Sequence, residues 1–237
     1  MQCPECQVGN ADDHNYCKHC GFPLRAHAVE RDLGFGSAER ARDRCQRIVA
    51  QYPENAEAHF NLGTAQYHLG QLDEAISAFR RAVSLDDTLA HAHFQLGVSY
   101  YRRGRLDECA SSCRRALQSN PSSVPARYRL ALALFHLGDL AEARESFQWV
   151  VGADPGYVIA HYHLGVIHER LGAVDEAIEA FGRVAQANPD DAAAHYHLGL
   201  NYKHKWLDDL AIGEFVHVLQ IDPLDGAAEA ELRSLER

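Results

Sequence analysis

The chain has 237 residues, a formal net charge of -10 and 46% hydrophobic residues. It contains no long apolar run, and its first residues lack the basic flank and apolar segment of a secretion signal, so we expect a soluble, cytoplasmic protein without membrane insertion. Most of the negative charge falls on residues 56–237, which makes nucleic acid and anionic lipid poor general partners.

Residues 3–24 contain two CxxC pairs separated by ten residues. Four thiolates at this spacing can bind one tetrahedral ion, and soft sulfur ligands favour zinc. The segment resembles the short zinc-ribbon module found at the ends of many bacterial proteins. We therefore expect residues 1–24 to form a zinc ribbon around one structural Zn2+. The same resemblance implies a bacterial protein. The predicted ligands are Cys3, Cys6, Cys17 and Cys20.

Other interpretations of this segment have less support. A redox-active CxxC needs a surrounding βαβ domain, which so short a segment cannot provide. His14 and His19 could replace a ligand, but four cysteines already complete a closed site. Because a closed site leaves no coordination position open, the zinc is expected to be structural and to supply most of the folding free energy of the ribbon.

Residues 25–36 are predicted to form a linker. After it, Ser37 can cap a helix that Pro53 stops. The small and apolar residues of this helix follow the spacing of the repeats that come next. We therefore assign residues 37–55 to an N-terminal capping helix, equivalent to the second helix of a repeat whose first helix is missing.

A pattern with a period of 34 residues fills residues 56–225 and is written five times. One column pairs leucine with a small residue: Leu62-Gly63, Leu96-Gly97, Leu130-Ala131, Leu164-Gly165 and Leu198-Gly199. Another column holds Phe79, Cys113, Phe147, Phe181 and Phe215. This period with these residues resembles the tetratricopeptide repeat (TPR), which implies an all-α solenoid of five helix-turn-helix units. Residues 226–237 are expected to form a C-terminal capping helix, with Ala227, Ala230 and Leu235 sealing the end of the array.

Four of the five units place a glycine near the end of the first helix, which fits a left-handed C-terminal cap. These glycines are Gly70, Gly104, Gly138 and Gly172. Trp206 takes this place in the fifth unit, so the sequence does not define that turn. In the second unit, Cys109 and Cys113 occupy helix-packing columns, and because cysteine is among the most buried residue types we interpret them as core residues.

No motif typical of an enzyme is present, whether a glycine-rich phosphate loop, a GxSxG elbow or an HExxH helix. The chain has 15 histidines, but no two are three or four residues apart, the spacing that would place two metal ligands on one face of a helix. Four of them instead share one column of the repeat, where an imidazole ring can fill a gap between helices. These are His59, His93, His161 and His195.

Three columns of the first helices suggest a binding surface. By the resemblance, the residue two before the leucine-glycine pair projects toward the concave groove in which peptide partners of tetratricopeptide proteins lie. Aromatic residues with arginine are typical of interface hot spots, although the rings could also pack against neighbouring helices. The set would suit a partner segment with apolar anchors and some negative charge. The predicted partner-binding residues are Phe60, Tyr67, Phe94, Tyr101, Arg102, Tyr128, Phe135, Tyr162, Arg170 and Tyr196.

One familiar groove chemistry is absent from these columns. Chaperone-binding tetratricopeptide proteins hold a C-terminal carboxylate with lysine, asparagine and arginine. Here Phe60 occupies the lysine position and Thr64 the first asparagine position, so a chaperone tail is not the expected partner.

The sequence therefore predicts a non-enzymatic scaffold or adaptor that binds a protein or peptide segment, with the ribbon as a structural or accessory module. No small-molecule substrate is expected. One alternative is a nucleic-acid-associated factor that uses the ribbon to contact RNA or DNA. Another is a metal or redox sensor that uses the ribbon as a switch.

Overall fold

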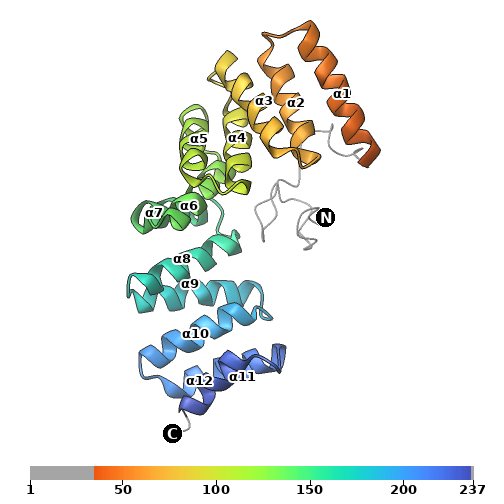
Figure 1. Ribbon diagram of the computed structural model, residues 1–237. Helices are drawn as coiled ribbons and strands as arrows, with labels where there is room; N and C mark the ends of the chain where they lie inside the picture. The colour runs from red at the N-terminus through yellow and green to blue at the C-terminus, as the bar shows by residue number, and fades with distance from the viewer. Residues whose placement is uncertain (1–34, 236–237) are drawn as a thin grey trace. The chain divides into compact units, whose positions relative to one another are not determined.

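The computed structural model describes residues 35–235, which form twelve helices and no strand (Figure 1). Within these residues, no helix combines the length and apolar character that a membrane crossing requires. The predicted zinc ligands Cys3, Cys6, Cys17 and Cys20 lie outside the described residues. The helices are α1 Phe35–Gln51, α2 Ala56–His68, α3 Leu72–Leu85, α4 Ala90–Arg102, α5 Leu106–Ser119, α6 Val124–Leu137, α7 Leu140–Ala153, α8 Val158–Arg170, α9 Val174–Ala187, α10 Ala192–His204, α11 Asp208–Ile221 and α12 Gly226–Leu235.

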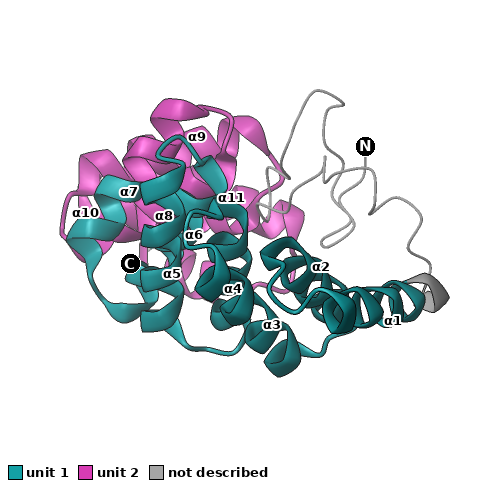
Figure 2. Cartoon of the chain, turned by 90° about the horizontal axis from the view of Figure 1, so that it is seen from above, with its two compact units in different colours: residues 1–17, 21–146 teal, residues 18–20, 147–237 magenta. Residues whose placement is uncertain are grey.

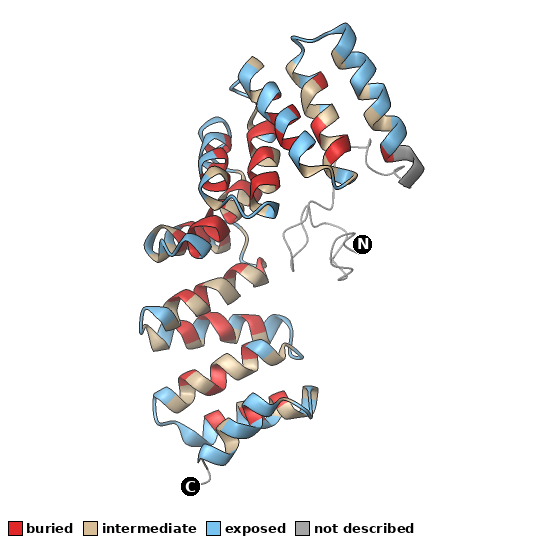
Figure 3. Cartoon of the chain, viewed as in Figure 1, coloured by how far each residue is buried: buried red, intermediate tan, exposed pale blue. Residues whose placement is uncertain are grey.

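The chain divides into two compact units, whose described parts are residues 35–146 and 147–235 (Figure 2). Helices that follow one another along the chain pack together from α1 to α6 in the first unit and from α8 to α12 in the second, and the buried residues lie along the sides of the helices that face each other (Figure 3). This alternation of first and second helices is the helix-turn-helix pattern predicted from the period of 34 residues.

Polar side chains define where several first helices begin. The side chains of Asn55, Ser123 and Asp191 each accept a hydrogen bond from the backbone N–H three residues later, at 3.0, 3.4 and 3.0 Å. Each bond satisfies an N–H group that the helix itself leaves without a partner.

The turns between the two helices of each repeat have a left-handed residue, as the glycines predicted. Their φ angles are 74°, 71°, 87° and 72° at Gly70, Gly104, Gly138 and Gly172. Trp206 adopts the same conformation, with φ of 60°, and is the one non-glycine residue among the described ones with positive φ. A bulky residue in this region costs about 1–3 kcal/mol of strain, so the fifth turn keeps its shape although its residue disfavours it.

A close contact between a glycine and an aromatic ring joins the two helices of several repeats. A Cβ atom added at Gly63, Gly165 or Gly199 would lie within 2.7 Å of the ring of Phe79, Phe181 or Phe215, respectively. These three rings are fully buried. At these three positions glycine is therefore required, because no side chain fits between the helix backbone and the ring. The third repeat differs, since it has Ala131 in this column.

The histidine column has a repeated structural role. The Nε2 atoms of His59, His93, His161 and His195 lie 2.9, 3.1, 3.3 and 2.9 Å from the backbone carbonyl oxygen six residues earlier. Each ring thereby connects its first helix to the loop that precedes it. This agrees with the interpretation of these residues as packing elements.

The second repeat replaces the buried phenylalanine with a thiol pair. Cys109 and Cys113 are fully buried and hydrogen-bonded to each other. The bond from Cys113 lowers the pKa of Cys109, whereas the same bond and burial raise the pKa of Cys113. The Arg129 guanidinium lies near enough to lower the pKa of both thiols. The structure supports the interpretation of both cysteines as core residues.

Helices α1 and α12 differ from the predicted capping helices in detail. Helix α1 begins at Phe35, two residues before the predicted cap Ser37. In α12 the fully buried residue is Ala228, and Leu232 and Leu235 pack beside it against the α11 core. Ala227 and Ala230 are exposed, so the prediction that they cover the end of the array is wrong. The buried face of the helix is shifted by one residue.

The glycine-ring contact generates a prediction. Gly165→Ala should destabilise the fold by about 1–3 kcal/mol, because its Cβ would lie 2.6 to 2.8 Å from three ring carbons of Phe181. Gly182→Ala is the matched control: no atom lies within 4 Å of the added Cβ, and alanine should stabilise this helix by about 0.5–1 kcal/mol. Urea unfolding measures both, and equal effects would contradict the proposed contact.

Candidate binding surface on the first helices

All ten predicted partner-binding residues lie on first helices of repeats. Those of the first unit are on α2, α4 and α6, and those of the second unit are on α8 and α10.

Two tyrosine rings in the first unit each carry an arginine. The Arg102 guanidinium carbon lies 4.9 Å from the ring centroid of Tyr67, and that of Arg129 lies 4.9 Å from the ring centroid of Tyr101. Both tyrosines are partly exposed, and Arg102 is exposed. Burial raises the pKa of Tyr101, and the charge of Arg129 opposes this shift. Two aromatic rings with positive charge over them are thus available on α2 and α4.

The phenylalanines of the same surface are half-buried. The Phe60 ring makes an edge contact with His91 at 4.4 Å between centroids and also contacts Phe79 at 5.7 Å. His91 lies 3.3 Å from the carboxylate of Glu57, and both of these side chains are about half exposed. Phe94 is partly exposed on α4. These rings can therefore both support the helices and present an apolar edge to a partner.

Two predicted contact residues are buried. Tyr128 is 4% exposed and Phe135 is 9% exposed, although both occupy columns whose other aromatic members remain partly exposed. Neither side chain is accessible to a partner in this structure, so both are removed from the candidate surface. Their columns were assigned from repeat position, which does not report how completely neighbouring side chains cover a ring.

The second unit has a hydrogen-bonded network at the corresponding place. The Tyr162 hydroxyl lies 3.3 Å from His197 Nε2, and His197 Nδ1 lies 3.1 Å from Glu169 Oε1. Asn201 Nδ2 donates to the same carboxylate at 2.5 Å and to the His197 backbone oxygen at 2.8 Å. With a proton on Nδ1, His197 donates a hydrogen bond to Glu169 and accepts one from the Tyr162 hydroxyl at Nε2, so all of these groups have partners. The network thereby fixes Tyr162 and Glu169 in position.

Ring stacking also holds His197 in position. His197 stacks on Phe181 with 4.6 Å between centroids and an interplanar angle of 4°. Burial raises the pKa of Tyr162, and the nearby carboxylates of Asp191 and Glu169 raise it further. The Tyr162 phenol therefore stays protonated and remains a hydrogen-bond donor at neutral pH.

The remaining predicted partner-binding residues of the second unit are Tyr196 and Arg170. Tyr196 is partly exposed and its ring contacts Phe215 at 5.8 Å, while Arg170 is exposed. Lys203 donates to Glu231 at 2.6 Å and to Ser234 at 2.7 Å, which connects α10 to α12. The Lys203 ammonium group is therefore bound by partners within the second unit.

Sequence reasoning missed the column directly after the aromatic one. It contains Arg129, His163 and His197. His163 stacks on Phe147 at 5.1 Å with an interplanar angle of 14°, which repeats the arrangement of His197 on Phe181. The recurrence of histidine at this position, 34 residues apart, was the signal that could have identified it.

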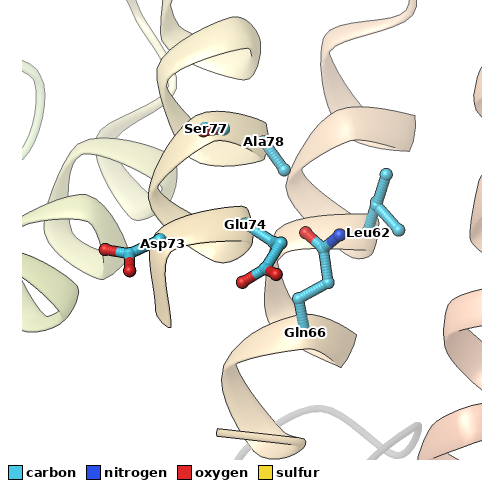
Figure 4. Close-up of a pocket in the computed structure, with 6 residues that line it drawn as sticks. All are labelled: Leu62, Gln66, Asp73, Glu74, Ser77 and Ala78. Carbon is cyan, nitrogen blue, oxygen red and sulfur yellow. The ribbon is translucent and has the colours of Figure 1, made fainter. Parts of the chain in front are cut away.

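An open depression of about 460 Å3 lies between α2 and α3 (Figure 4). None of the predicted partner-binding residues lines it, and its Asp73 accepts a hydrogen bond from Arg103 at 2.5 Å. Across the described part of the chain, no group of three or more histidine, cysteine, aspartate or glutamate side chains is arranged to hold a metal ion. The lining residues are Leu62, Gln66, Asp73, Glu74, Ser77 and Ala78.

Comparison with protein families identifies the chain. The tetratricopeptide repeat family matches residues 29–90, 128–192 and 174–202, which together exceed half of the chain. The chain therefore belongs to the tetratricopeptide repeat family. A second family, subunit 3 of the anaphase-promoting complex (cyclosome), matches residues 80–150.

Individual proteins are similar to this chain in structure or in sequence. The structure of YrrB, titled a TPR protein with an unusual peptide-binding site, has a TM-score of 0.75 at 22% identity, over 81% of this chain and 100% of that chain. A crystal structure of MamA has a TM-score of 0.66 at 26% identity, over 68% of this chain and 95% of that chain. The probable biofilm formation methyltransferase WspC of Pseudomonas putida is 34% identical over 58 residues, which span 24% of this chain and 14% of that relative.

The network around Glu169 generates a prediction. Asn201 is 4% exposed, and Asn201→Ala removes a donor from a partly buried carboxylate, so the free energy of unfolding should fall by about 1–3 kcal/mol. Asn61→Ala, at an exposed position of α2, should change it by less than about 0.5 kcal/mol. Chemical denaturation compares the two variants, and an Asn201→Ala protein as stable as wild type would exclude a structural role for the network.

Proposed function

We propose that the first helices of the repeats bind a segment of a partner protein, and that the protein is an interaction scaffold. Its family and fold support this class of function. The observation that carries the proposal is the pair of partly exposed tyrosines on α2 and α4, each with an arginine over its ring. Aromatic and arginine side chains are the residue types that dominate binding energy in interfaces.

The charges on this surface indicate the chemistry of the partner. Arg102 and Arg129 add positive charge beside the aromatic rings of the first unit, in a chain whose net charge is -10. A partner segment with acidic residues next to apolar or aromatic anchors matches this combination. Phe60 and Phe94 supply further apolar area on the same helices. A binding function of this kind needs no catalytic group, and we propose none.

Peptide selection tests this proposal. A random peptide library displayed on phage is selected against the full chain, and we expect enrichment of sequences that combine aspartate or glutamate with aromatic residues. The double variant Tyr67→Ala/Tyr101→Ala should bind the selected peptides about tenfold more weakly or worse, because truncating a hot-spot residue costs over about 1 kcal/mol of binding free energy. Arg129→Gln should reduce the preference for acidic residues.

Tyr52→Ala serves as the matched control, because Tyr52 is an exposed tyrosine that follows α1 and is not on a first helix. It should leave peptide affinity unchanged. Selected peptides that are basic, or that bind the double variant as tightly as wild type, would refute the proposed surface.

We also propose that Cys3, Cys6, Cys17 and Cys20 bind one zinc ion in a ribbon that serves as a structural or accessory module. The support is the sequence spacing of the four thiols. Purified chain should contain close to one zinc, and Cys17→Ser should release it, whereas Cys45→Ser on α1 should retain it. Chelation should leave the thermal unfolding of the repeats largely unchanged. Zinc retained by the Cys17→Ser protein would show that the ligand set is different.

A further inference from the structure

The turn between α10 and α11 exposes an unusual cluster of apolar side chains. Trp206 is 87% exposed, and Leu207 and Leu210 are 41% and 52% exposed. Trp206 also has a left-handed backbone conformation that the other four turns reserve for glycine. A large ring is thus held in water on a backbone that disfavours it.

The same three positions are polar or small in the other repeats. Leu210 occupies the column of Glu74, Glu108, Glu142 and Glu176. Leu207 occupies the column of Gln71, Arg105, Asp139 and Ala173. Three apolar replacements at one turn give the fifth repeat a hydrophobic patch that the other four repeats lack at the same positions.

The turn itself does not require these side chains. The N–H groups of Trp206 and Leu207 donate to the backbone oxygens of Lys203 and Tyr202, both at 3.0 Å. The second repeat makes the equivalent two bonds at 2.9 Å with glycine in place of tryptophan. The patch therefore serves neither the backbone hydrogen bonds nor the core of its own unit.

Polar and charged side chains flank the patch in a self-complementary order, in which Lys205 carries the positive charge. His204 and Lys205 precede Trp206, and Asp208 and Asp209 follow Leu207. All four are exposed, and no ion pair between residues 35 and 235 involves either aspartate. Lys205 pairs with Asp175, an exposed contact that can be exchanged at little cost. A two-fold axis through the patch would bring the basic edge of one copy to the acidic edge of the other.

We propose that residues 204–210 form a contact between two copies of this chain, in which Trp206, Leu207 and Leu210 pack against the same residues of the second copy. The basic and acidic edges then pair across the two-fold axis. Stable complexes bury about 1,200–2,000 Å2 in total, and a patch of three side chains offers less, so the dimer is weak. This contact is separate from the partner-binding surface on the first helices.

Sedimentation equilibrium of the full chain tests the contact from about 10 µM to about 1 mM, the range in which a weak dimer dissociates. We expect the average mass to rise toward that of a dimer. Trp206→Gly should weaken association at least about tenfold while raising the melting temperature by about 2–4 °C, because glycine relieves the backbone strain. Leu224→Ser, at a residue that is 92% exposed after α11, should change neither quantity.

A charge-exchange experiment distinguishes this contact from non-specific association. His204→Glu/Lys205→Glu and Asp208→Lys/Asp209→Lys should each reduce self-association, because both edges of the contact then carry the same sign. A mixture of the two variants should dimerise again, since opposite charges meet at both edges of the mixed dimer.

Three results would overturn the proposal. The first is a wild-type chain that stays monomeric at about 1 mM. The second is a Trp206→Gly protein that dimerises like wild type, which would place the contact elsewhere. The third is a lower melting temperature for Trp206→Gly, which would give the tryptophan a structural role within its own chain.

Discussion

The close approach of the two helices within a repeat is the constraint on which the rest of the structure depends. At Gly165 and Gly199 there is no room for a Cβ atom, because the rings of Phe181 and Phe215 lie against the helix backbone. With the helices at this distance, the small residues of the second helix are buried and the first helix of the next repeat can pack on the ring. The rings are therefore the shared core of neighbouring first and second helices.

Side chains just beyond this core determine what each unit can present to a partner. His197 stacks on Phe181 and turns its nitrogens toward Tyr162 and Glu169, so the core ring positions a polar network. In the first unit, Arg129 extends from the thiol pair of the second repeat to the ring of Tyr101. Packing and candidate binding are thus linked through the same column of residues.

The sequence predicted the helix pairs and most turns because the columns of the repeat are set by local packing. It predicted the helical caps less well: the buried face of α12 contains Ala228, not Ala227 and Ala230, since one residue of register is decided by the fit against Phe215 and Val218. It could not predict accessibility. Tyr128 and Tyr162 share a column, yet the first is buried and the second is partly exposed, because exposure depends on the side chains around each ring.

The presence of Cys113 in one repeat and Arg129 in the next limits the order in which the repeats can follow one another along the chain. In the third and fourth repeats, a histidine of the next repeat stacks on the buried phenylalanine, as His163 does on Phe147 and His197 does on Phe181. Cys113 occupies the phenylalanine column and Arg129 the histidine column. Moving the second repeat to another place would leave an arginine against an aromatic ring on one side and a histidine over a small thiol on the other. The repeats share a common plan, but they are not interchangeable modules, and their order along the chain is itself encoded in the core.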